Sequence, residues 1–151
     1  MAATDGYDHV LLPTDGTEAT EAAIAEAGRI ARLADATVHV LSVADSRNRF
    51  ESPTAGLAAE AWADAEHDRA ETAIDHAVTA LPDDVETERV VREGIPHAEI
   101  LDYAESAAID VVVMGTHGRT GLDHYLIGSV TERIVRNAPV PVLTVRASGS
   151  A

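Results

Sequence analysis

The segment from Gly115 to Thr131, which reads GTHGRTGLDHYLIGSVT, has the residue types and spacing of a phosphate-binding loop. It follows an apolar run at 109–114 and ends on Gly128-Ser129, directly before a helical pattern. Glycines let backbone N–H groups approach an anion, and the start of a helix adds aligned donors and partial positive charge. The segment therefore predicts that the chain binds the phosphates of a nucleotide.

Both ends of this segment contribute to the predicted phosphate site. The expected main-chain contacts are Gly115, Gly118, Gly128, Ser129, Val130 and Thr131. His117 and Arg119 are included as cationic members, and a solvated surface position is the alternative for both. Ser129 and Glu132 also match the S-x-x-E pattern of a capping box, with Ser129 as the N-cap residue. We expect the Ser129 hydroxyl to be able to cap the helix and still donate to a phosphate.

Asp15 is a second candidate for a chemical role. It follows an apolar run at 9–12 and the pair Pro13-Thr14, and it precedes Gly16. As a structural residue it would close this turn or cap the next helix, with Thr17 as a competing cap. As a functional residue, its carboxylate would need a bridging Mg²⁺ or Mn²⁺ beside a triphosphate, or would reach the base or ribose instead. Both interpretations stay open.

The alternation of short β-branched runs with Ala-rich helical patterns predicts an α/β fold. Strands are expected at 9–12, 37–43, 85–91, 109–114 and 139–145, and helices at about 17–34, 57–80, 96–106 and 129–137. Such alternation implies right-handed βαβ units and one doubly wound, five-stranded parallel sheet of Rossmann-like type. In the order 3-2-1-4-5, the first and fourth strands are neighbours at the switch point, beyond which ligands bind. The loops at Asp15 and Gly115 would then face each other.

Charge is the unusual feature of the composition. The chain has 26 acidic and 11 basic residues, a formal net charge of −15, and no Lys. An acidic chain without Lys is typical of a salt-accumulating cytoplasm, where the Debye length falls to about 3 Å at 1 M salt. A merely acidic mesophilic protein is the alternative. Double-stranded nucleic acid is not an expected partner, because its binding depends on cationic contacts to phosphate.

The 151 residues predict one domain, 1–151, with an ordered core at about 7–146.

Several classes of site are missing from the sequence. Without Cys there is no disulfide or thiolate nucleophile. No apolar run approaches the ~20 residues of a membrane span, and the acidic start does not resemble a signal peptide, so a cytoplasmic location is expected. The P-loop, G-x-G-x-x-G, H-E-x-x-H and G-x-S-x-G patterns are absent, so efficient catalysis is not expected.

Together these motifs resemble the universal stress protein family, in its ATP-binding branch. The resemblance rests on Pro13-Thr14-Asp15, Val43, the glycine set that ends in Gly128-Ser129, and the closing strand at 139–145. It covers nearly the whole chain, from about position 7 to 146.

The resemblance implies a nucleotide site and a dimer. It places Asp15 in an ATP site, with Pro13, Val43 and Met114 as apolar contacts at the adenine end. It also implies a homodimer through the fifth strand, Val140 to Val145. A proline within that strand suits a sheet edge, because it cannot donate to the ladder.

The expected function is therefore that of a cytoplasmic, homodimeric protein with Mg-ATP in the switch-point crevice. A protein partner, whose identity the sequence does not indicate, would detect the nucleotide-bound surface of the loop at 116–127. Three alternatives stay open: a slow Mg-dependent ATPase that uses Asp15, a nucleotide-free dimeric adaptor, and a binder of AMP or a cyclic nucleotide.

Overall fold

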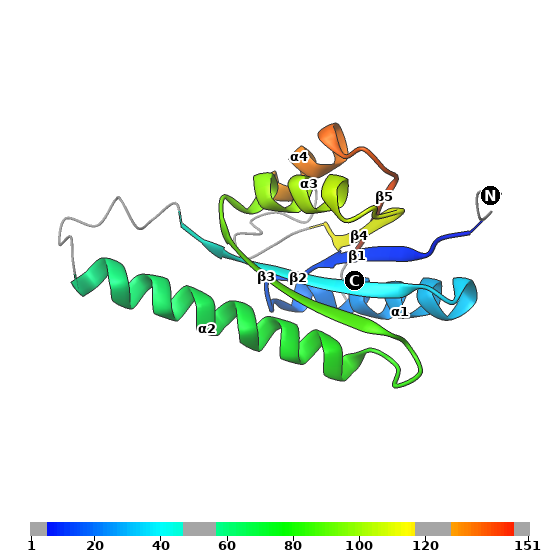
Figure 1. Cartoon of the computed structure of the whole chain (residues 1–151), viewed down its shortest axis with the longest axis horizontal. Helices are drawn as coiled ribbons and strands as arrows, with labels where there is room; N and C mark the ends of the chain where they lie inside the picture. The colour runs from blue at the N-terminus through cyan, green and yellow to red at the C-terminus, as the bar shows by residue number, and fades with distance from the viewer. Residues whose placement is uncertain (1–5, 47–56, 117–127, 147–151) are drawn as a thin grey trace.

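A computed structural model describes residues 6–46, 57–116 and 128–146 of the chain. Its five strands form one parallel sheet between two helical layers (Figure 1). The strands are β1 His9–Pro13, β2 Thr37–Asp45, β3 Thr87–Gly94, β4 Val111–Gly115 and β5 Val142–Val145. The helices are α1 Glu21–Ala34, α2 Leu57–Ala80, α3 Pro96–Ser106 and α4 Ser129–Asn137, and a 3-10 turn, η1, at Glu18–Thr20 precedes α1.

The strand order β3-β2-β1-β4-β5 confirms the order expected from the sequence. Every neighbouring pair is parallel, and β1 pairs with β4 through Val10↔Val111 and Leu11↔Val112. These two strands are the switch point, since the chain leaves β1 toward one side of the sheet and β4 toward the other. Their following loops emerge at the same edge of the sheet.

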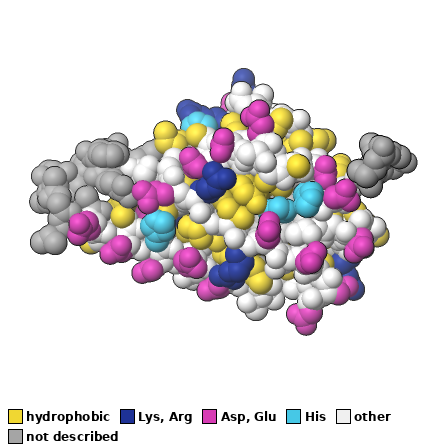
Figure 2. Space-filling view, in the orientation of Figure 1, with side chains coloured by type: hydrophobic (Ala, Val, Ile, Leu, Met, Phe, Trp, Pro, Cys, Tyr) yellow, Lys and Arg dark blue, Asp and Glu magenta, His cyan; other side chains and the backbone are white. Residues whose placement is uncertain are grey.

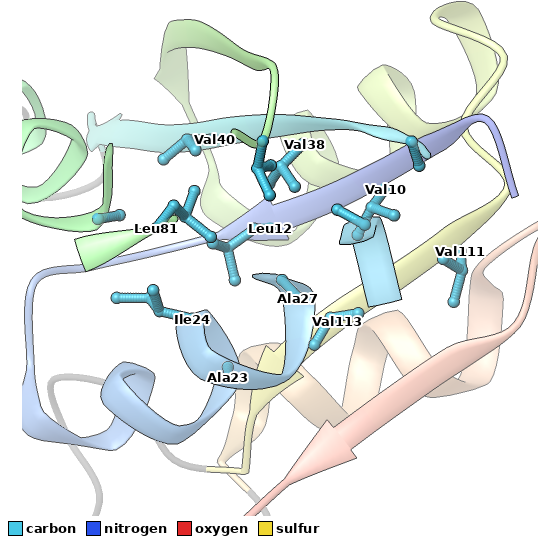
Figure 3. Packing of buried hydrophobic residues seen from close by; sticks show 14 of the residues in the cluster. Val10, Leu12, Ala23, Ile24, Ala27, Val38, Val40, Leu81, Val111 and Val113 are labelled. Atoms are coloured by element: carbon cyan, nitrogen blue, oxygen red, sulfur yellow. The ribbon is translucent and has the colours of Figure 1, made fainter. Parts of the chain in front are cut away.

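Two hydrophobic clusters separate the helices from the sheet. Strand side chains alternate between the faces, so Val10 and Leu12 of β1 pack toward α1 and α2, whereas Leu11 packs toward α3 and α4. Figure 3 shows the first cluster, where Ala23, Ile24 and Ala27 of α1 and Leu81 lie against Val10, Leu12, Val38, Val40, Val111 and Val113 of the sheet. Alanines on α1 and α2 let the helices approach the strands closely, which suits a core with few aromatic residues.

The strand boundaries differ from expectation at both edges of the sheet. β3 extends to Gly94 because it pairs with the long β2 from Val38↔Thr87 to Asp45↔Gly94. β5 begins only at Val142, since Pro139 and Pro141 have no N–H for a ladder. The helix bounds expected at 57–80, 96–106 and 129–137 are confirmed.

Acidic side chains are spread over the visible face of the molecule, many of them along α2 (Figure 2). The exposed acids of this helix are Glu60, Asp64, Asp68, Glu71 and Asp75. Within the described ranges, no helix has the length and apolar character needed to cross a membrane.

Candidate functional site

The loop after β1 is held by short local hydrogen bonds. The Thr14 N–H donates to Leu41 O at 2.9 Å, and the buried Thr14 Oγ1 accepts the Gly16 N–H at 3.3 Å. Asp15 Oδ1 accepts the N–H of Thr17 at 3.0 Å and its hydroxyl at 2.7 Å. Asp15 thus closes an Asx turn, which is the structural role weighed for it from the sequence. Its second carboxylate oxygen, Oδ2, makes none of these bonds.

Helix α2 supports this loop from the face of the sheet that α1 and α2 cover. Arg69 donates from Nη1 to Asp15 O at 3.2 Å and from Nη2 to Val43 O at 2.7 Å. Glu66, which is 4% exposed, accepts the Asp45 N–H at 3.0 Å and lies 3.4 Å from Arg69 Nη2. Sequence analysis missed this buried pair. The only available signal was an i,i+3 Glu–Arg spacing on a helix rich in exposed acids.

Gly16 gives α2 a second point of contact with the same loop. Its φ is +81°, a conformation that glycine adopts without strain. A Cβ at this position would lie 3.3 Å from Ala73 Cβ. Helix and loop are therefore in close contact one turn beyond Arg69.

The end of β4 is joined to the start of α4 by two hydrogen bonds. The buried Thr131 hydroxyl donates to Gly115 O at 2.9 Å, and the Gly128 N–H donates to Thr116 O at 2.7 Å. These bonds bring together the two ends of the predicted phosphate-binding segment. The Thr131 hydroxyl proton is already donated, so the contribution available from Thr131 is its main-chain N–H.

The first turn of α4 has the geometry of an anion site. The first intrahelical bond runs from the Glu132 N–H to Gly128 O at 2.9 Å. The N–H groups of Ser129, Val130 and Thr131 precede it, so they have no partner inside the helix. Aligned donors of this kind, with the positive end of the helix dipole, bind phosphate and carboxylate groups.

The predicted capping box at this helix start is wrong. Gly128, with ψ of 153°, is the N-cap residue, and Ser129 is already the first helical residue. A helical residue does not direct its side chain at the N–H groups of its own first turn, and Glu132 lies four residues after the cap instead of three. Glu132 pairs with Arg136 at 3.1 Å, while Ser129 is exposed.

The apolar residues predicted for the adenine end lie on one face of the sheet. Val43 and Met114 are 7% and 5% exposed and belong to the cluster under α3 and α4. Val130 packs against the same cluster. Pro13 is buried and, by strand alternation with Leu11, belongs to the same face. The structure thus brings Pro13, Val43 and Met114 to the carboxyl ends of three adjacent strands.

The remaining predicted site residues, His117, Gly118 and Arg119, lie outside the described residues. In the part of the chain that the structure describes, no three His, Asp or Glu side chains are grouped as metal ligands.

A separate polar cluster lies at the opposite, amino half of the strands. His39 Nε2 lies 3.1 Å from His9 Nδ1, and His39 Nδ1 lies 2.7 Å from the Tyr103 hydroxyl and 3.1 Å from Glu88 Oε2. Burial lowers the pKa of His39, against an opposing effect of Glu88 and with a further lowering by His9. Burial, and then Glu88, raise the pKa of Tyr103, while Arg92 lowers it.

The fold and the site together define a class of protein. It is a doubly wound α/β domain in which β1 and β4 are neighbours at the switch point and the start of α4 is hydrogen-bonded to the end of β4. The chain belongs to the universal stress protein family, whose model matches residues 6–146. Universal stress protein MJ0531 of Methanocaldococcus jannaschii is 36% identical in an alignment of length 146 that covers 93% of this chain and 82% of that protein.

Solved structures agree with the family and with the fold. Protein MJ0577, also of Methanocaldococcus jannaschii, superposes with a TM-score of 0.83 at 30% identity, covering 95% of this chain and 99% of that chain. The universal stress protein from Archaeoglobus fulgidus in complex with dAMP shares the fold, with a TM-score of 0.67 at 21% identity. That match covers 91% of this chain and 97% of the other. The predicted family and sheet topology are confirmed.

Proposed function

We propose that this chain is an adenine-nucleotide-binding regulatory protein that holds ATP, together with Mg²⁺ or Mn²⁺, at the switch point of its sheet. The observation that carries the proposal is the first turn of α4. Three consecutive N–H groups without helical partners lie where hydrogen bonds join α4 to the end of β4. The dAMP complex of the Archaeoglobus fulgidus protein supports the choice of ligand, because it places an adenine nucleotide in a protein of this fold.

Each end of the site has its own chemistry. The N–H groups of Ser129 and Val130 would donate to phosphate oxygens, and the segment that contains His117, Gly118 and Arg119 would complete the phosphate contacts. The apolar residues at the strand ends would contact the adenine ring. Asp15 Oδ2, the oxygen that takes no part in the Asx turn, would accept a hydrogen bond from a ribose hydroxyl or bind the cation.

The proposal includes a homodimer that forms at β5. This strand lies at one edge of the sheet, and Leu143 in it is 39% exposed. Val135 on the adjacent α4 is 49% exposed. Pairing of β5 with its copy would cover an open row of backbone groups and the exposed apolar side chains next to it. With a formal charge of −15 on each chain, such a dimer would depend on salt, as in a halophilic protein.

The deciding experiment identifies the nucleotide that the protein carries. Protein purified throughout in molar KCl is denatured, and the released small molecules are identified by chromatography and mass spectrometry. We expect ATP at close to one per chain. The Gly118→Val, Gly128→Val double variant should carry none, since the added side chains block the approach of phosphate. Gly6→Val is the matched control, because a Cβ on Gly6 would meet nothing within 4 Å.

The alternatives give different results in the same experiment. Release of AMP or a cyclic nucleotide would show that the adenosine end determines binding. A site that stays empty after Mg-ATP is added would favour the dimeric adaptor and contradict the proposal. Multiple-turnover phosphate release that disappears in Asp15→Asn would identify a slow ATPase.

A further inference from the structure

The bridge that Arg69 makes lies where the hydrogen-bond ladder between β1 and β2 ends. The last paired residues are Pro13↔Leu41, and the Thr14 N–H still donates to Leu41 O. Asp15 and Val43 each lie two residues beyond that last pair. The ladder does not fix the separation of their main chains, because the pairing of β1 with β2 ends before them.

Arg69 joins the two main chains beyond the end of the ladder. Its two terminal nitrogens reach the carbonyl oxygens of Asp15 and Val43, at 3.2 and 2.7 Å. A planar guanidinium presents its donors in a fixed fork, so one side chain holds two acceptors at a set spacing. Arg69 therefore links these two main chains through one rigid group.

Glu66 holds the fork in place. Its Oε1 lies 3.4 Å from Arg69 Nη2 and also accepts the Asp45 N–H at 3.0 Å. The Arg69 and Glu66 side chains are 22% and 6% exposed, so solvent screens this pair less than the surface pairs. The Asp15 and Val43 carbonyls and the Asp45 N–H, which this pair binds, are main-chain groups of the loop after β1 and of the end of β2.

We propose that Arg69 and Glu66 are positioning residues of the nucleotide site, which set the spacing between Asp15 and Val43 and thereby the affinity for the adenosine half of the ligand. The inference rests on the proposed function. Both residues reach the strand ends from the α2 side, whereas Val43 faces the α3 and α4 side. They act through the main chain and do not touch the ligand. The phosphate half depends on α4 instead, and this pair does not contact α4.

The test compares adenosine, AMP and ATP as ligands of the full chain in molar KCl. Binding is followed by calorimetry and by the fluorescence of Trp62, the only tryptophan, whose indole N–H donates to Asp45 O at 3.3 Å. The variants are Arg69→Met and Arg69→Lys. Arg29→Met is the matched control, because Arg29 forms an i,i+3 pair with Glu26 on α1. Circular dichroism establishes that each variant is folded under the conditions of the titration.

We expect both Arg69 variants to weaken all three ligands by the same factor, roughly 10-fold, which corresponds to about 1.4 kcal/mol. Lysine keeps the charge and the partner Glu66, so it preserves the fold, but a single ammonium cannot hold both carbonyls. Arg29→Met should bind like the wild type. A loss of stability alone would lower the melting temperature and leave the Kd of the folded protein unchanged.

Three results would overturn the inference. Wild-type affinity in Arg69→Lys would mean that the positive charge at position 69 is sufficient and that the paired donors of the guanidinium are not required. A loss that grows from adenosine to ATP would place the action of Arg69 at the phosphates. Unchanged binding in both variants would refute the positioning role while leaving the proposed function intact. If the wild type bound none of the three ligands, the proposed function would fail, and this inference with it.

Discussion

His39 Nδ1 lies 2.7 Å from the Tyr103 hydroxyl oxygen, a contact between residues 64 positions apart that joins β2 to α3. Both side chains are buried, at 5% and 8% exposed. The Arg92 guanidinium lies over the Tyr103 ring, 5.3 Å from its centre. This buried polar contact within an otherwise apolar layer gives the stability of the protein a dependence on pH.

The first prediction concerns acid pH. Burial keeps the pKa of His39 below the value of about 6.5 that histidine has in an unfolded chain. The unfolded chain therefore binds a proton more readily than the folded one. The contribution of neutral His39 to stability is complete above pH 6.5, decreases as the pH falls below that value, and is lost below the folded pKa. Urea unfolding at pH 5, 6, 7 and 8 measures the slope.

The variant His39→Gln should flatten this slope, because an amide does not titrate. His76→Gln is the control, since His76 is half-exposed on α2 and its pair with Glu21 is screened in molar KCl. An unchanged slope in His39→Gln would show that another group controls acid unfolding. At alkaline pH the stability of the protein should fall as the pH rises. The raised pKa of Tyr103 stabilises the fold below pH ~10, and this contribution is lost as the pH rises through the pKa of Tyr103 in the folded protein.

The second prediction concerns the loop after β1. Gly16→Ala should lower the free energy of unfolding by ~1–2 kcal/mol, the cost of a positive φ for a residue with a Cβ. The contact with Ala73 Cβ at 3.3 Å adds to that cost. Gly6→Ala, in open surroundings, should stay within ~0.5 kcal/mol of the wild type. Equal stability of the two variants in chemical denaturation would contradict the loop conformation.

The third prediction concerns the link between β4 and α4. Thr131→Val keeps the shape of the side chain but leaves Gly115 O without its donor at 2.9 Å. We expect a loss of ~1–3 kcal/mol, the usual cost of a buried unsatisfied carbonyl. Thr72→Val, at an exposed position of α2, should change stability by less than ~0.5 kcal/mol. Nucleotide affinity should fall in Thr131→Val alone, which isothermal titration would measure.

The fourth prediction concerns salt. Between 1 M and 0.01 M, the Debye length grows from about 3 Å to about 30 Å, so the acidic side chains repel one another over longer distances. With a net charge of −15, both the melting temperature and the dimer fraction should fall in millimolar KCl. Sedimentation and thermal unfolding measure the two effects. Sucrose at the same osmolality should not restore the dimer, and a dimer that persists in dilute buffer would refute the halophilic interpretation.

Much of the fold follows from local patterns in the sequence. The alternation of β-branched runs with Ala-rich segments predicted a parallel, doubly wound sheet, because a strand, its crossover helix and the next parallel strand form a right-handed unit. The expected strand order 3-2-1-4-5 is also the observed one. The bounds of α2, α3 and α4 were also predictable. Helix signals are local: they depend on apolar spacing and on prolines such as Pro96 in a first turn.

The capping error at α4 shows the limit of such local signals. Glycine and serine are both accepted at an N-cap, so Gly128-Ser129 leaves the first helical residue undetermined by one position. The structure selects Gly128, because its N–H donates to Thr116 O and its carbonyl accepts the Glu132 N–H. Thr116 lies outside the S-x-x-E pattern that predicted the capping box.

By itself, the sequence determined the class of fold, the family and the two loops that follow the neighbouring strands β1 and β4. It did not determine how those loops are held. Arg69 is joined to Asp15 across 54 positions and to Val43 across 26, and in both cases the acceptor is a main-chain carbonyl. Every residue has such a carbonyl, so no pattern of residue types marks the ones that an arginine will reach. Only the packing of α2 against the ends of β1 and β2 decides that contact.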